Sequence, residues 1–135
     1  MFFCIGILYA LVSYAMTVKD CGLGRAYFKI DQLAISPANP VAGQNLTLDY
    51  GYTVPPGALI TGGLTTYAVT YNFIPLAPTT EPLCSSTACP IVGGTYANQS
   101  TIAWPSGLSG SITVKTKWED TEKQLLLCTL ISGNV

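Results

Sequence analysis

The sequence predicts an all-β fold, a sandwich of two antiparallel sheets with about seven strands and two disulfides. Apolar residues recur at every second position in several segments, as they do in strands with one buried face. Proline or glycine interrupts almost every window that a helix would need. The 135 residues suit one domain with a single core, and no internal repeat or linker divides them.

The amino-terminal segment, Met1 to Val18, is apolar and carries no charged side chain. Ser13 and Ala15 place small residues at the end of the apolar run, where signal peptidase cleaves. This pattern predicts a signal peptide at residues 1–15 and a mature domain at residues 16–135. Because the run is close to the lower length limit of a membrane span, an uncleaved anchor is the alternative interpretation.

Alternation predicts the strands of the first half of the mature domain. Apolar residues at spacing two between Tyr27 and Ile35 change phase once, which predicts a bulge. The segment Asn45–Tyr52 alternates cleanly and predicts a half-buried strand. We expect Pro55–Gly57 to end this strand, and we expect Leu59–Leu64 to form a short strand of its own.

The second half of the chain continues the same pattern. Tyr67–Phe73 alternates until the proline-rich approach to Cys84, and Tyr96–Trp104 is a weaker strand. Ile112–Trp118 alternates with polar residues, and its terminal tryptophan is expected in the core. A charged turn at residues 119–122 then leads to the closing strand, Leu125–Leu130.

The cysteines indicate an oxidising compartment. Of the five, Cys4 lies in the apolar run, which leaves Cys21, Cys84, Cys89 and Cys128 in the mature domain. Four cysteines permit three connectivities that the sequence does not distinguish, although a short inner bridge within a long outer one is the simplest. In a reducing cell the same set could instead bind zinc, but the signal-like start argues against that.

Two glycosylation triplets fit a secreted chain. They begin at Asn45 and Asn98, although such triplets also arise by chance. We therefore predict glycosylation at both asparagines.

The composition argues against an enzyme. Histidine is absent from the sequence, so the commonest general base and metal ligand is missing. The carboxylates of Asp20, Asp31, Asp49 and Glu81 are scattered without the pairing that glycoside hydrolysis needs. A net charge of −1 gives no electrostatic footprint for nucleic acid. We predict no enzymatic activity, no cofactor, no metal and no nucleic-acid partner.

Several motifs together resemble the ML (lipid-recognition) domain family, which includes phosphatidylglycerol/phosphatidylinositol transfer proteins and a lysosomal cholesterol carrier. They are Asp20-Cys21-Gly22, Ser36-Pro37 followed by Pro40 and Gly43, the Cys84–Gly94 stretch with Cys89-Pro90-Ile91, and Cys128 in the last strand. The resemblance covers essentially the whole mature chain. It implies an immunoglobulin-like sandwich whose sheets splay apart around a lipid, with disulfides Cys21–Cys128 and Cys84–Cys89.

The leading hypothesis is a lipid carrier, secreted or in the endolysosomal or vacuolar lumen, that hands a phospholipid, sterol or fatty acid to a membrane or receptor. Sterol carriers of the family have a further cysteine pair after the Ser-Pro position, which this chain lacks. The alternative is a structural or interaction module, in the extracellular space or on a virion surface, with a filled core. The predicted lipid-binding residues on the alternating strands are Leu48, Tyr50, Val69, Tyr71 and Val114, whose alternative role is ordinary core packing. The resemblance implies three more at the pocket, Phe73, Leu76 and Trp104, and the alternative for Trp104 is a plain core or edge aromatic.

Overall fold

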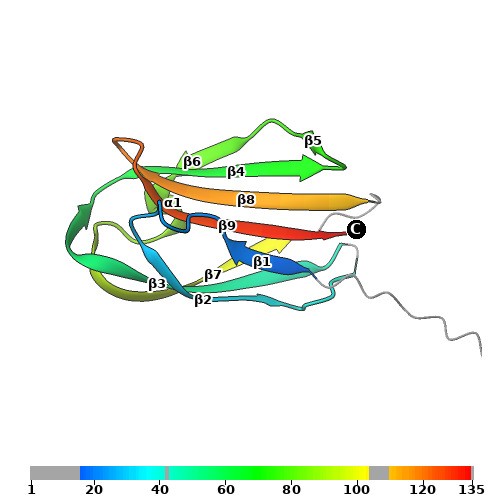
Figure 1. Cartoon of the computed structure of the whole chain (residues 1–135), viewed down its shortest axis with the longest axis horizontal. Helices are drawn as coiled ribbons and strands as arrows, with labels where there is room; N and C mark the ends of the chain where they lie inside the picture. The colour runs from blue at the N-terminus through cyan, green and yellow to red at the C-terminus, as the bar shows by residue number, and fades with distance from the viewer. Residues whose placement is uncertain (1–15, 42, 104–109, 135) are drawn as a thin grey trace, which may run out of the picture.

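The computed structural model describes residues 16–41, 43–103 and 110–134, which form two layers of antiparallel strands (Figure 1). The larger sheet has the order β1-β9-β8-β4-β5, with β6 also paired to β4, and the smaller sheet has the order β2-β3-β7. The larger sheet comprises β1 (Thr17–Asp20), β9 (Leu125–Asn134), β8 (Ser111–Asp120), β4 (Gly63–Tyr71), β5 (Ile74–Pro75) and β6 (Thr79–Pro82). The smaller sheet comprises β2 (Lys29–Ser36), β3 (Asn45–Ile60) and β7 (Ile91–Ala103), and one helical turn, α1 (Leu83–Ser86), follows β6.

The predicted fold class is confirmed, but the strand number is higher than expected. The described residues contain nine strands and not about seven. The additional ones, β1, β5 and β6, are only two to four residues long, which is too short for an alternating pattern to be recognised. The single turn α1 was also not predicted.

Strand β3 carries the inner face of the smaller sheet. Its inward residues Leu46, Leu48, Tyr50 and Tyr52 are all buried, as the alternation predicted. The predicted bulge is also present, because the register of β2 against β3 shifts between Ile30 and Gln32.

The prediction that Pro55–Gly57 ends this strand is wrong, because β3 continues to Ile60. The register against β7 jumps between the pairs Val54–Gly94 and Leu59–Val92, so the intervening residues of β3 face Gly93 alone. The prolines therefore lie where no ladder hydrogen bond is required of them. A Cβ at Gly93 would lie 2.9 Å from the Pro55 carbonyl oxygen, so the close approach of the strands here requires glycine. The predicted Leu59–Leu64 strand is accordingly divided between the end of β3 and the start of β4.

Both disulfides implied by the resemblance are present. Cys21–Cys128 joins the chain after β1 to the middle of β9 over a sequence separation of 107 residues. Cys84–Cys89 closes a loop around the end of α1, with a separation of 5 residues. The first bridge fastens the amino-terminal part of the domain to its last strand, and the second shapes one local loop.

One end of the sandwich is filled by aromatic rings. Tyr52 stacks on Phe28 at 5.6 Å and on Tyr96 at 5.4 Å between ring centroids. Trp118 meets Tyr52 edge-on at 5.5 Å. Trp118 is 2% exposed, which confirms its predicted place in the core.

Two predictions fall outside the described residues, namely the signal peptide at residues 1–15 and the role of Trp104. Within the described ranges, no helix has the length and apolar character that crossing a membrane would require.

Candidate functional site

A cavity of about 460 Å³ lies between the two sheets. This volume falls within the range of about 300–1,000 Å³ that is typical of small-molecule sites. The cavity is lined by residues of both sheets and of the β6–α1 segment: Leu48, Tyr50, Tyr67, Glu81, Ser85, Ser86, Gln99, Ser100, Thr101, Ile102, Val114, Thr116, Trp118, Leu127 and Thr129.

The pattern of exposure along β8 shows where the sheets separate. Residues at spacing two share one face of a strand, so Ile112, Val114, Thr116 and Trp118 all point toward the smaller sheet. Ile112 and Trp118 are buried at 3% and 2% exposure, whereas Val114 and Thr116 between them remain half-buried. Val114 remains half-buried in the middle of a central strand because its side chain faces an empty space. Val114 and Thr116 both line the cavity.

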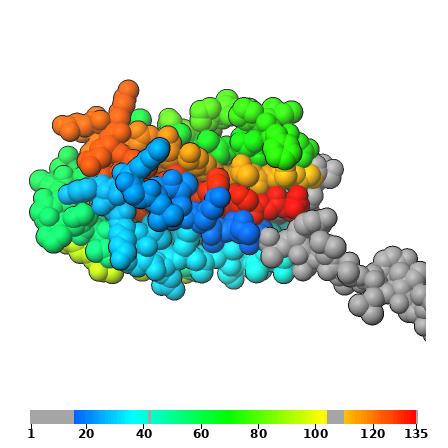
Figure 2. All heavy atoms as spheres, in the orientation of Figure 1, coloured from blue at the N-terminus to red at the C-terminus, as the bar shows by residue number. Residues whose placement is uncertain are grey.

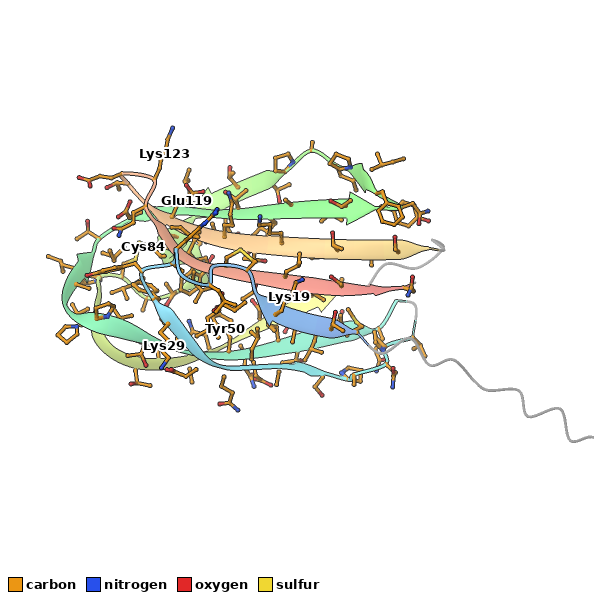
Figure 3. The ribbon with its side chains drawn as sticks, viewed as in Figure 1. Lys19, Lys29, Tyr50, Cys84, Glu119 and Lys123 are labelled. Carbon is orange, nitrogen blue, oxygen red and sulfur yellow. A yellow bond between two sulfur atoms is a disulfide. The ribbon has the colours of Figure 1, made fainter. Side chains whose placement is uncertain are left out.

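The cavity opens beside the edge strand of the smaller sheet. Gln99 and Thr101 of β7 are exposed and yet line it, and Ser85 of α1 lies on the same rim. The Cys84–Cys89 disulfide closes the loop that contains this serine (Figure 3). The mouth is thus formed by β7, the edge strand of the smaller sheet among the described residues, on one side and by the disulfide-closed loop on the other.

Aromatic side chains close the inner end of the cavity. Tyr50 lies between the two sheets (Figure 3) and meets Trp118 edge-on, with ring centroids 5.8 Å apart and an interplanar angle of 76°. Burial raises the pKa of Tyr50 from 10.0 to about 12, because the phenolate would lose its hydration there. The inner end therefore suits an apolar group and disfavours an anion.

This burial predicts a loss of stability in alkali. Unfolded Tyr50 ionises near pH 10 whereas the folded residue stays protonated to about pH 12, so ionisation of the unfolded chain lowers the free energy of unfolding across that interval. The expected loss is on the order of 2 kcal/mol at the top of the interval. Urea unfolding at a series of pH values should show this decline, and Tyr50→Phe should reduce it. The same slope in both proteins would contradict the assignment.

A hydrogen-bonded polar cluster lies where β4, β6 and α1 meet. The Tyr67 hydroxyl donates to Oε1 of Glu81 at 2.8 Å, and the Ser86 hydroxyl donates to the same oxygen at 2.9 Å. The buried hydroxyl of Thr65 lies 2.8 Å from that of Ser86. Burial and the neighbouring Glu81 both raise the pKa of Tyr67. Tyr67, Glu81 and Ser86 line the cavity, so this cluster gives it one polar wall.

The structure brings together only some of the predicted lipid-binding residues. Leu48, Tyr50 and Val114 line the cavity. Two more, Val69 and Tyr71, are partly buried and pack against the hydrophobic core. Val69 is the register partner of Val114.

Two further predicted residues lie outside the cavity. Phe73 is in the turn between β4 and β5 and is 90% exposed, and Leu76 is 51% exposed. Trp104 has no described position.

The polar half of the lining was not predicted. Tyr67 and Thr116 are register partners at inward positions of β4 and β8, so the period-two pattern could have indicated them. Glu81 and Ser86 lie on β6 and α1, which are too short for a periodic pattern to be recognised.

The two glycosylation triplets lie in different environments. Asn45 is exposed at the start of β3. Asn98 is half-buried on β7, and its side-chain nitrogen donates to the Tyr52 hydroxyl at 3.3 Å and to Thr87 at 3.4 Å. A glycan on that nitrogen replaces one of its two protons and would require at least one of these hydrogen bonds to be lost, whereas Asn45 has no such cost.

The fold and its cavity define a disulfide-stapled β-sandwich with a binding space between parted sheets. The chain belongs to the ML domain family, whose model matches residues 15–135. It is 31% identical, over 132 residues, to a Dictyostelium discoideum protein named for phosphatidylglycerol/phosphatidylinositol transfer, covering 93% of this chain and 92% of that protein. A second D. discoideum protein with this kind of name is 34% identical over 82 residues, covering 58% of this chain and 52% of that protein.

Two solved structures share the fold at low sequence identity. A Niemann-Pick type C2 protein from the Japanese carpenter ant superposes with a TM-score of 0.60 at 14% identity, covering 87% of this chain and 98% of that one. Chicken MD-1, solved in complex with lipid IVa, superposes with a TM-score of 0.57 at 11% identity and 90% coverage of each chain.

Proposed function

We propose that this protein binds one lipid between its two sheets and transfers it between membranes. The observation that supports this most strongly is the cavity of about 460 Å³, because it lies where a structural sandwich would be closely packed. The D. discoideum relatives named for phosphatidylglycerol/phosphatidylinositol transfer support a phospholipid as cargo.

The energetics suit an acyl chain. Burial of a methylene contributes about 0.8 kcal/mol, so about ten methylenes contribute on the order of 8 kcal/mol before the costs of association. The apolar part of the lining, with Leu48, Val114 and Leu127 from three strands, provides such a surface. Two disulfides further support function outside the cytoplasm, either secreted or in an endolysosomal or vacuolar lumen.

Transfer requires contact with a membrane, and the β4–β5 turn is the surface that we propose for it. Phe73, Ile74 and Leu76 are 90%, 64% and 51% exposed. No charged residue occurs between positions 50 and 80. The β4–β5 turn and the residues that flank it in sequence therefore carry no charge that would oppose insertion into a bilayer. The green segment with β4, β5 and β6 forms the upper right rim of the molecule in Figure 2.

The backbone of this turn supports the same assignment. Asn72 and Phe73 both have positive φ, at 47° and 66°, in a two-residue connection where glycine is normally preferred at the second position. The turn is fixed to the start of β8, because the Asn72 side chain accepts a hydrogen bond from the Ser111 amide at 2.9 Å. A fully exposed aromatic residue in a strained conformation gains nothing from packing, which favours a role in binding.

Phe73→Gly should therefore separate stability from transfer. We expect the free energy of unfolding to stay within about 1 kcal/mol of the wild type, because glycine adopts this backbone conformation without strain. Binding to phosphatidylcholine vesicles should fall about tenfold, since one phenylalanine no longer enters the bilayer. Sedimentation with vesicles measures this. Leu23→Ser, which removes another exposed apolar side chain in the β1–β2 connection, is the control, and an equal loss in both variants would contradict the assignment.

The transfer itself is tested with labelled phosphatidylinositol in donor vesicles and unlabelled acceptor vesicles. We expect the protein to accelerate the exchange and to retain labelled lipid after the vesicles are removed. A rate equal to that of buffer, with no lipid retained, would overturn the proposed function.

A further inference from the structure

The polar wall of the cavity has a definite hydrogen-bonding polarity. An ionised carboxylate only accepts hydrogen bonds, so the protons of Tyr67 and Ser86 are both committed to Oε1 of Glu81. Since Ser86 has only one proton, Thr65 is the donor in the Thr65–Ser86 hydrogen bond. The hydroxyl protons of Tyr67 and Ser86 thus point to the carboxylate and that of Thr65 points to Ser86, so the cluster presents lone pairs to the cavity.

One acceptor of the cluster is still available. Among the described residues, no hydrogen bond reaches the second carboxylate oxygen of Glu81, Oε2, although the side chain lines the cavity. A carboxylate can accept at both oxygens, and a partly buried one gains most from a donor that enters with the ligand.

The surrounding charge excludes an anionic group from this position. All six basic residues lie in the described part of the chain, and none of them lines the cavity. Lys123, for example, points away from the sandwich at the tip of the β8–β9 hairpin (Figure 3). A phosphate or carboxylate placed beside Glu81 would meet a like charge without a compensating cation.

On the basis of the proposed lipid-binding function, we propose that Glu81, held by Tyr67 and Ser86, is the head-group site of the cavity, and that it selects lipids whose head group donates a hydroxyl. An alcohol or polyol can donate to Oε2, whereas an ester cannot donate and a carboxylate is repelled. The hydroxyls of a glycerol or inositol head group are donors of this kind.

Three ligands of equal chain length test this site on the wild-type protein. Dodecanol, methyl dodecanoate and dodecanoate are each titrated at neutral pH to displace a bound fluorescent fatty alcohol. We expect dodecanol to bind at least about tenfold more tightly than either of the others, because a hydrogen bond to a charged group is gained by it alone. Equal affinities, or tighter binding of dodecanoate, would overturn the assignment of Glu81. If none of the three ligands binds, both the assignment of Glu81 and the proposed lipid-binding function would be overturned.

Glu81→Gln tests the residue itself. Glutamine keeps the size and one acceptor oxygen but removes the charge and adds a donor, so the preference for dodecanol over dodecanoate should fall at least about tenfold. Glu122→Gln makes the same change of charge in the exposed β8–β9 turn and should leave the preference unchanged. Binding of methyl dodecanoate, which depends on the apolar lining alone, reports whether the cavity is intact in each variant. An intact cavity with an unchanged preference in Glu81→Gln would refute the proposal.

Discussion

Replacing Cys21 and Cys128 together by serine is expected to lower the free energy of unfolding by about 5 kcal/mol, and replacing Cys84 and Cys89 by about 2 kcal/mol. The difference follows from loop entropy, since the first bridge closes a sequence separation of 107 residues and the second a separation of 5. Cys128 is also 1% exposed, so a serine hydroxyl there would be buried without an assured partner. Denaturant unfolding of both double variants measures the two losses.

The two bridges should also differ in their effect on ligand binding. The inner bridge constrains the loop that places Ser85 and Ser86 on the cavity wall. We therefore expect the Cys84→Ser/Cys89→Ser variant to remain folded and to bind lipid more weakly. A larger stability loss for this variant than for Cys21→Ser/Cys128→Ser would contradict the loop-entropy account.

Adding bulk inside the cavity is expected to abolish lipid uptake with little loss of stability. Val114→Phe places the larger side chain in an empty space, so the free energy of unfolding should fall by less than about 1 kcal/mol. Ile112→Phe lies on the same face of β8, two residues away, but its side chain is 3% exposed in a packed environment. Overpacking there should cost about 1–3 kcal/mol.

Lipid uptake is the second measurement on these variants. Val114→Phe combined with Ser100→Phe narrows the cavity from both sheets, and bound lipid should fall below detection in this double variant. Ile112→Phe should still bind lipid at temperatures where it is folded. If Val114→Phe is as destabilising as Ile112→Phe, the space between the sheets is already filled in solution, and the carrier account fails.

The sequence could predict those parts of the fold in which one physical requirement dominates. Strand β3 has one fully buried face, so Leu46 to Tyr52 show a clean alternation that matches their burial. The nested disulfides followed from a family resemblance, because spacing alone left three pairings open. Where two requirements compete, prediction failed. Pro55 and Pro56 do not end β3, because the register shift opposite Gly93 removes the need for their hydrogen bonds.

The site was less predictable than the fold for two physical reasons. An alternating pattern identifies the inward face but does not show whether that face meets a partner or an empty space, so Val114 and Ile112 look equivalent in sequence although only Val114 lines the cavity. Apolar character was also the wrong criterion for half of the lining. Glu81 and Ser86 line the cavity because β6 and α1 place them beside Tyr67 in the fold, and no local sequence pattern predicts that contact.

Phe73 illustrates the limit of periodicity at a strand end. It continues the alternation of Tyr67, Val69 and Tyr71, and the family resemblance implies a place at the pocket mouth, so the sequence predicts that it faces the lipid. The chain turns at Asn72 and Phe73 with positive φ at both residues, so the side chain leaves the sheet and is 90% exposed. The exposed position supports a separate role for it, in membrane contact.

The central claim is that lipid occupies the space between the sheets, and native mass spectrometry of the purified protein tests it most directly. The protein is expressed in a eukaryotic secretory host, and the mass is compared before and after solvent extraction, with the extracted lipids identified. We predict one lipid per protein in the wild type and in Glu122→Gln, and none in the Val114→Phe/Ser100→Phe variant. A wild-type protein that has the mass of the bare chain, and that acquires no lipid after incubation with phosphatidylinositol vesicles, would contradict the account.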